Sequence, residues 1–284
     1  MSAEYNPAGL IAEYSCISDF VAAAGMPMAR LKVNQSKADY WEGQPSAGAP
    51  WFGLPAGTPC GTSAISKLVL AGWPEGAKRM ADVAALLDSD LIRPADLKRR
   101  VVWGAQGDEL SMDRVYSGRI DIAWRSSKRR VRQSNRLITL CADSIVSGDA
   151  SSEALYWRGA AVVVLADMLQ SAGYHCRIMG NFTGRTLGGE TVSCTVIVKD
   201  FGATLSMVDC ATLALPGFFR SIGHRWIPVH AMQESGSTGI APRSLPKGIA
   251  DYAATGVSSA ELAAQWITRS IEHINSTESW QEGE

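Results

Sequence analysis

The chain has few of the features that would name a reaction. None of its six cysteines forms a Cys-x-x-Cys pair, and no two of its four histidines stand four residues apart, which excludes the common zinc-binding spacings. It contains neither a Walker loop ending in Gly-Lys-Ser/Thr nor a Gly-x-Ser-x-Gly elbow. Because no nucleophile–base pair and no metal set can be assembled from motifs, the sequence predicts no catalytic residues and does not predict an enzyme.

Long apolar runs are also missing. The most continuous one, residues 160–169, is interrupted by Asp167, whereas a membrane span needs about 20 apolar residues. The first residues show neither the basic nor the apolar region of a secretory signal. We therefore expect a cytoplasmic protein with reduced thiols, in which Cys141 and Cys194 are buried because they lie within apolar runs.

The charge is small overall but unevenly placed. A hydrophobic fraction of 46% is typical of a globular chain, and a net charge of −1 excludes a protein that coats nucleic acid over its whole surface. Residues 97–136 nevertheless hold eleven Lys or Arg and four Asp or Glu, a net charge of +7, so the remainder carries −8.

The densest part of this basic window is a candidate nucleic-acid site. It lies between two predicted strands, as a hairpin tip or a loop, where cations can contact phosphates and a tryptophan can stack on bases. The alternative is a solvated connection whose charges face water or pair with the acidic remainder. The candidate residues are Trp124, Arg125, Lys128, Arg129, Arg130, Arg132 and Arg136.

Residues 1–96 form a predicted helical and proline-rich N-terminal region. Residues 42–62 hold four prolines and predict a long loop. Trp41, Trp51 and Phe52 lie in or beside this loop and either pin it to the domain or form a binding lip. Helices are expected over 62–71 and from Pro74 to about residue 87, since proline suits the first turn of a helix.

Residues 97–284 form a predicted α/β domain. A buried strand over 137–142, a helix over 152–171 closed by Gly173, and a second buried strand over 174–179 predict a βαβ unit with parallel strands. Further strands are expected over 100–103, 119–124, 191–198 and 225–229. Helical segments are expected over 211–222 and after a capping box at 258–261. In the last helix, Leu262, Trp266 and Ile274 would share a face. The fold class is α/β, a parallel-rich sheet with flanking helices plus a helical N-terminal extension.

Ligands in such folds gather beyond the carboxyl ends of the parallel strands. Asp143 and Ser147 follow the first strand of the unit, and their oxygens suit a hard ion such as Mg²⁺. The alternative is a loop in which Asp149, Ser151 or Ser152 caps the next helix. Arg158, early in that helix, either points to the strand ends and binds an anion or serves as a surface or ion-pair residue.

The stretch from residue 137 to 178 resembles the opening of a von Willebrand factor A-type domain. In that family the first strand ends in an Asp-x-Ser-x-Ser motif that holds a metal ion, and a helix and a second strand follow. Asp143 and Ser147 match the first and last positions, whereas Ile145 replaces the middle serine. The resemblance implies a von Willebrand factor A-like or Rossmann-like core, either with Mg²⁺ or as a degenerate, metal-free relative.

A second resemblance covers residues 49–226. The segments Trp51-Phe-Gly, Gly72-Trp-Pro-Glu-Gly, Tyr156-Trp-Arg-Gly-Ala-Ala and Asp167-Met-Leu-Gln-Ser-Ala-Gly-Tyr are similar to an uncharacterised family from tailed phages and their hosts. It implies a phage origin and a place in the host cytoplasm. The sequence thus favours a non-catalytic binding protein that presents its strand-end loops to a macromolecule, protein or nucleic acid. The alternative is a nucleic-acid-binding protein, on single-stranded DNA in phage transcription or replication, that uses residues 125–136.

Overall fold

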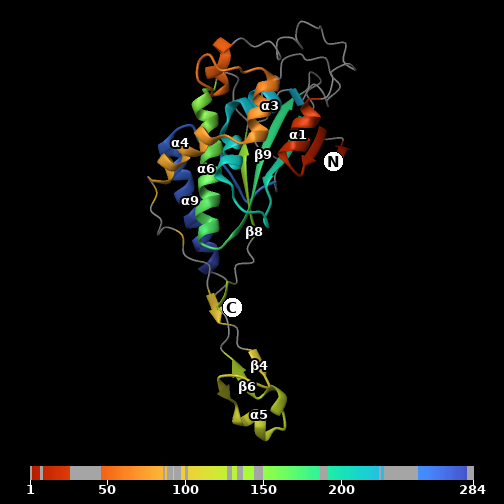
Figure 1. The fold of residues 1–284 in the computed structure, drawn as a ribbon, viewed down its shortest axis with the longest axis vertical. Coiled ribbons are helices and arrows are strands. Elements are labelled where there is room, and N and C mark those ends of the chain that lie inside the picture. The colour runs from red at the N-terminus through yellow and green to blue at the C-terminus, as the bar shows by residue number, and fades with distance from the viewer. Residues whose placement is uncertain are drawn as a thin grey trace.

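A six-stranded sheet forms the centre of the structure, a computed structural model (Figure 1). Its strands, in spatial order, are β1 (Ser2–Asn6), β2 (Gly9–Tyr14), β10 (Thr191–Lys199), β9 (His175–Arg185), β8 (Leu137–Asp143) and β11 (Tyr252–Ala253). The structure describes residues 2–6, 9–25, 46–85, 87, 92, 97–99, 102–126, 130–132, 137–143, 150–185, 191–223, 225–226 and 249–279.

The sheet is mixed, with more parallel than antiparallel neighbours. β2 runs parallel to β10, and both β9 and β11 run parallel to β8. β1 with β2 and β9 with β10 form antiparallel pairs. The predicted βαβ unit is confirmed: β8 leads into α6 (Ser152–Ser171), which returns to β9 with Leu137 opposite His175 and Asp143 opposite Asn181.

Helix α6 begins and ends where the sequence predicts. The Ser151 hydroxyl caps it by accepting a hydrogen bond from the Ala154 amide at 3.1 Å. Gly173, with a φ of 99°, lies just beyond its end, a backbone conformation that favours glycine. Eleven of its twenty residues are buried, because the sheet and other helices cover it on several sides (Figure 1).

The remaining helices of the main body pack against α6, against one another and against the side of the sheet formed by β2 and β10. Phe20 stacks on Phe182 at a centroid distance of 4.8 Å, and Phe218 meets Phe182 at 5.2 Å, so aromatic contacts join the first helix to the sheet. These helices are α1 (Ile17–Ala24), η2 (Ser46–Phe52), α3 (Thr62–Ala71), α4 (Pro74–Ala84), α7 (Met207–Cys210), η5 (Ala211–Ala214), η6 (Phe218–Gly223) and α9 (Ala260–Ser279). None of the helices that the structure describes combines the length and apolar character needed to cross a membrane.

The N-terminal part differs from the predicted helical extension. α3 and α4 begin at the predicted residues, but β1 and β2 join the central sheet, where Gly9 to Tyr14 pair with Thr191 to Val196. The apolar run of β2 covers only residues 10–12, which is too short to indicate a strand by periodicity, and its pairing partner lies far along the chain. The N-terminal part therefore contributes to the sheet as well as covering it.

Three further predictions were wrong in detail. Residues 119–124 do not form one strand: Ile120–Ile122 is a single 3₁₀ turn (η4), because Gly118 reverses the chain at a φ of 77°. Arg225 and Trp226 are helical, and 227–229 lie outside the described residues. Leu262 is 41% exposed, since the buried face of α9 follows helical spacing through Ala263, Ile267, Ile271 and Ile274.

Two small elements stand apart from the main body. β3 (Leu97–Arg99) and β7 (Arg130–Arg132) pair into an antiparallel ribbon, which we call the basic ribbon. Residues 102–126, the distal lobe, contain β4 (Val102–Gly104), β5 (Glu109–Leu110), α5 (Met112–Tyr116), η4 and β6 (Trp124–Ser126), with strand order β4-β6-β5. Figure 1 shows the distal lobe at the far end of the ribbon from the six-stranded sheet.

Candidate functional site

The carboxyl end of β8 brings Asp143 and Arg158 together. Asp143 is 2% exposed, and the Arg158 guanidinium donates hydrogen bonds to the backbone carbonyls of Asp143 at 3.2 Å and Val257 at 3.4 Å. Burial lowers the pKa of Arg158, and the charge of Asp143 partly offsets that shift. Arg158 therefore points to the strand end, as one of the two interpretations of the sequence predicted. Its hydrogen bonds support the backbone there.

The described residues show only part of the predicted metal site at this strand end. The described residues contain no group of three His, Cys, Asp or Glu side chains that could hold an ion. The carboxylate of Asp143 already interacts with the nearby charge of Arg158. Ser147 lies outside the described residues. The capping interpretation, by contrast, is confirmed for Ser151.

Next to Asp143, four buried polar side chains of the β9–β10 hairpin satisfy one another. The Asn181 amide donates to the Ser193 hydroxyl at 3.1 Å and to the Thr195 hydroxyl at 3.2 Å, and the Thr183 hydroxyl donates to the Asn181 carbonyl oxygen at 2.5 Å. We call these four residues the polar ladder. They alternate with core residues such as Phe182 and therefore face the other side of the sheet. Since none of them titrates, the ladder fixes strand register rather than supplying proton chemistry.

A second buried arginine, which no sequence motif indicated, lies at this end of the fold. Arg220 is 4% exposed and donates hydrogen bonds to the backbone carbonyls of Trp51 and Ala150. Its guanidinium carbon lies 4.4 Å from the centre of the Trp51 ring, which is 44% exposed. Burial lowers the pKa of Arg220 to about 10, and no carboxylate contacts it among the described residues. Trp51 is thus both pinned and presented at the surface.

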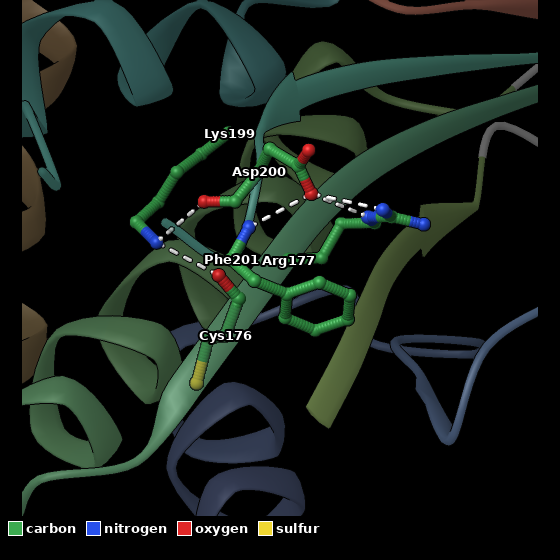
Figure 2. A network of polar contacts seen from close by, with 5 residues as sticks. All are labelled: Cys176, Arg177, Lys199, Asp200 and Phe201. Carbon is green, nitrogen blue, oxygen red and sulfur yellow. Dashed lines mark hydrogen bonds and ion pairs between the residues drawn. The ribbon is translucent and has the colours of Figure 1, made fainter. Parts of the chain in front are cut away.

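A buried lysine lies at the opposite end of the sheet (Figure 2). A register shift after Ile197 accompanies the inward turn of Lys199, which is 5% exposed. Its ammonium donates to the backbone carbonyl of Cys176 at 2.7 Å and to that of Asp200 at 3.1 Å. Burial lowers the pKa of Lys199. These bonds tie the end of β10 to the start of β9.

The neighbouring carboxylate completes this network. The Asp200 side chain accepts the Phe201 amide at 2.8 Å and pairs with Arg177 at 2.9 Å, and both contacts lower its pKa. Burial raises the pKa of the Cys176 thiol to about 12, which disfavours the reactive thiolate form.

The basic ribbon gathers charge of one sign. Its register places Arg99 opposite Arg130, Lys98 opposite Val131, and Leu97 opposite Arg132. The two connections that contain it, residues 97–101 and 127–136, hold eight Lys or Arg and no Asp or Glu. The distal lobe between them holds three Arg and four Asp or Glu. The basic excess of this region therefore belongs to the ribbon and its two flanking connections and not to the lobe.

The structure places the predicted nucleic-acid residues in two elements. Arg130 and Arg132 lie in β7, so this part of the segment is a paired strand rather than a hairpin tip or loop. Trp124 and Arg125 lie in β6, where Arg125 pairs with Glu109 at 3.2 Å on the surface and Trp124 is half-buried. Lys128, Arg129 and Arg136 lie outside the described residues.

Comparison with known proteins gives one result. Residues 12–265 match the model of a protein family described as a domain of unknown function, DUF7192. No curated protein and no solved structure matches the chain. The match includes the central sheet from β2 to β11, α6, the basic ribbon and the distal lobe.

Proposed function

We propose that this chain, which belongs to the DUF7192 family, is a non-catalytic protein that binds single-stranded nucleic acid through its basic ribbon. The observation that carries the proposal is the register of β3 and β7, which sets Arg99 opposite Arg130. Like charges directly opposite one another destabilise an antiparallel pair. A polyanion that binds along the ribbon removes this repulsion, so ligand binding and ribbon stability reinforce each other.

The composition of the ribbon supports a phosphate-backbone ligand. Eight cations without a carboxylate in two short connections form a local positive field, although the whole chain carries −1. Binding of this kind depends steeply on salt, because each neutralised phosphate releases counterions. An acidic protein segment would need fewer cations than the eight present here, and each of them would have to be held in a fixed geometry.

Trp124 favours a single strand over a duplex. It lies in β6, two residues before the connection that leads to β7, and no ring or cation contact involves it among the described residues. Trp103, on the adjacent strand, is covered by Arg114 at 3.9 Å. In this proposal an unpaired base stacks on the ring of Trp124.

Two further elements of the proposal rest on the sequence resemblances. Similarity to tailed-phage proteins supports an origin in a phage genome and action in the host cytoplasm, during transcription or replication. The order β8, α6, β9, with an aspartate ending β8, is the order that the von Willebrand factor A-type resemblance implies. In this proposal that core is a degenerate, metal-free scaffold.

The test is salt-dependent binding of a fluorescently labelled single-stranded oligonucleotide to the full chain. The variant Arg129→Ala/Arg130→Ala/Arg132→Ala is expected to bind more weakly. Each phosphate contact with a single strand contributes about 0.7 to the slope of log K against log salt, so the loss of three contacts should reduce this slope by about 2. The matched control changes three exposed cations on other helices, Lys67→Ala/Lys78→Ala/Arg269→Ala, and alters the net charge equally.

The control separates a local site from general charge attraction. An unchanged slope for the ribbon variant, or an equal loss in the control, contradicts the proposal. So does the absence of binding by the unmodified chain at low salt. Duplex of the same sequence serves as competitor, and tighter binding of the duplex contradicts the single-strand specificity.

The strand ends support a second candidate function, binding of an acidic protein segment. Arg220 is a buried cation that contacts no carboxylate in the part of the chain that the structure describes, and it lies beside the N-terminus of α6, which carries partial positive charge. Trp51 covers it with a half-exposed ring that can anchor a partner. Photocrosslinking from position 51 in nuclease-treated host extract is expected to yield one discrete protein product, and an acidic peptide from that protein should compete. A diffuse pattern identical to crosslinking from exposed Leu70 contradicts this candidate.

A further inference from the structure

The distal lobe exposes much of its apolar surface. Leu110 is 39% exposed, Met112 49%, Ile120 66% and Tyr116 82%. The described part of the chain has eight exposed large hydrophobic side chains, and half of them belong to these 25 residues. Among the lobe's described side chains, only Ala123 is a fully buried hydrophobic residue. An apolar surface of this kind on a small element indicates an interaction site.

The exposed residues are held on a defined framework. Arg114 points inward from α5, lies over Trp103 at 3.9 Å and donates to the Ile122 carbonyl at 3.3 Å. Met112 and Tyr116 are four residues apart on α5 and therefore share a side of that helix. Because the inner contacts fix α5, its apolar side does not need to reorganise to meet a partner.

The charges around this surface suit a second copy of the chain. Asp113, Arg119 and Asp121 are exposed beside the apolar residues, so both signs are present. The lobe has a net charge of only −1, which makes it a poor ligand for phosphates and causes little repulsion between copies. In an isologous contact, Arg119 of each copy can meet an aspartate of the other, so the same ion pair forms twice.

The location of the lobe also permits this contact. Figure 1 shows it at the far end of the basic ribbon, so two lobes can meet without the main bodies approaching each other. The strongly basic ribbons, which repel each other, then remain apart. We infer that the chain forms a two-fold dimer through the apolar surface of its distal lobe, with Leu110, Met112, Tyr116 and Ile120 at the contact.

Sedimentation velocity of the full chain tests this inference. The unmodified protein is expected to have twice its chain mass of 30.4 kDa, and Tyr116→Ser/Ile120→Ser is expected to sediment as a monomer. The matched control, Leu70→Ser/Leu262→Ser, replaces two hydrophobic residues with comparable exposure on α3 and α9 and should remain dimeric. Circular dichroism verifies that each variant is folded.

A charge exchange distinguishes a second copy from any other occupant. Arg119→Glu and Asp113→Arg/Asp121→Arg are each expected to be monomeric, and an equimolar mixture of the two should form a heterodimer. A monomeric unmodified chain, or a dimer that survives the Tyr116/Ile120 change, overturns the inference. A mixture that stays monomeric overturns the proposed ionic pairing. A lobe that binds another protein while the chain remains monomeric also overturns the inference.

Discussion

Gly159 of α6 lies directly against the backbone of Ala214. A Cβ atom on this glycine would stand 2.4 Å from the Ala214 Cα and 2.4 Å from the Leu213 carbonyl oxygen. The structure assigns the contact to η5, the short turn after α7, so this glycine allows the chain that follows β10 to reach the central helix.

We therefore expect Gly159→Leu to destabilise the protein. Overpacking against backbone costs about 1–3 kcal/mol or more, because neither partner can rotate away. A drop in Tm of at least about 3 °C is expected by calorimetry, given about 2–4 °C per kcal/mol in chains of roughly this size. Gly202→Ala is the control, because nothing lies within 4 Å of an added Cβ there. Equal Tm values for both variants would refute the contact.

Replacing one arginine of the opposed pair should separate ribbon stability from nucleic-acid binding. Arg99→Glu places a carboxylate opposite Arg130 and turns a repulsive cross-strand pair into an attractive one, worth about 0.2–1 kcal/mol. We expect slower amide hydrogen exchange in β3 and β7 together with weaker binding of single-stranded DNA. Arg99→Gln removes the repulsion without adding an anion. Its amide exchange rates and its affinity for single-stranded DNA should lie between those of the unmodified chain and those of Arg99→Glu. If Arg99→Glu binds DNA as well as the unmodified chain, the ribbon is not the site.

Thiol labelling should be almost confined to one position. Cys16 is the only cysteine that is not buried, and burial raises the pKa of the other five thiols. The native chain is expected to take up one iodoacetamide group at pH 8, as measured by intact mass, and six after denaturation. Cys16→Ser should abolish the native label. Rapid native labelling of Cys176 or Cys210 would contradict the burial that surrounds Lys199.

The Asp200 carboxylate should make stability depend on pH. Its folded pKa is below its ordinary value, so its contribution is fully present above the unfolded pKa and is lost as pH falls through the folded one. Asp200→Asn is therefore expected to lower the urea midpoint at pH 7 but not at a pH below the folded pKa. Glu272→Gln on α9 is the exposed control and should show no such crossover. A pH-independent difference would mean that Asp200 acts through packing alone.

Magnesium should not bind at Asp143. The charge of Arg158 already lies close to this carboxylate, and a hard cation would have to compete with it. Isothermal calorimetry with Mg²⁺ is expected to give the same small heat for the unmodified chain and for Asp143→Ala. Arg158→Met removes the competing cation and is the informative control. Heat that appears only with Asp143 present would restore the metal-site interpretation.

The sequence predicted best where local signals agreed. α6 has a serine cap, a continuous apolar body and a glycine after its end, and its predicted bounds match the structure. β8 and β10 likewise show as apolar or β-branched runs. In these elements the residues that define the ends lie next to the residues that define the body, so a short window contains the whole signal.

The remaining features depend on contacts between distant residues. β2 becomes a strand through pairing with β10. Hydrogen bonds to the backbone carbonyls of Trp51 and Ala150 determine the position of the Arg220 side chain. The polar ladder was visible as alternation in Asn181-x-Thr183 and Ser193-x-Thr195, a signal that the glycine-rich composition of residues 180–189 concealed. For the basic segment, charge predicted the region, whereas the register that opposes Arg99 and Arg130 required the structure.

The pairing of β2 with β10 also constrains how the protein acquires its fold in time. β2 is made well before its partner strand β10, which follows only after α6 and β9 have been made. Until then the edge of β10 that will receive β2 does not exist, and the first strands have no sheet to join. Closure of the sheet is therefore a late, long-range event, which favours slow folding and a period in which a nascent, unpaired edge is open to chaperones.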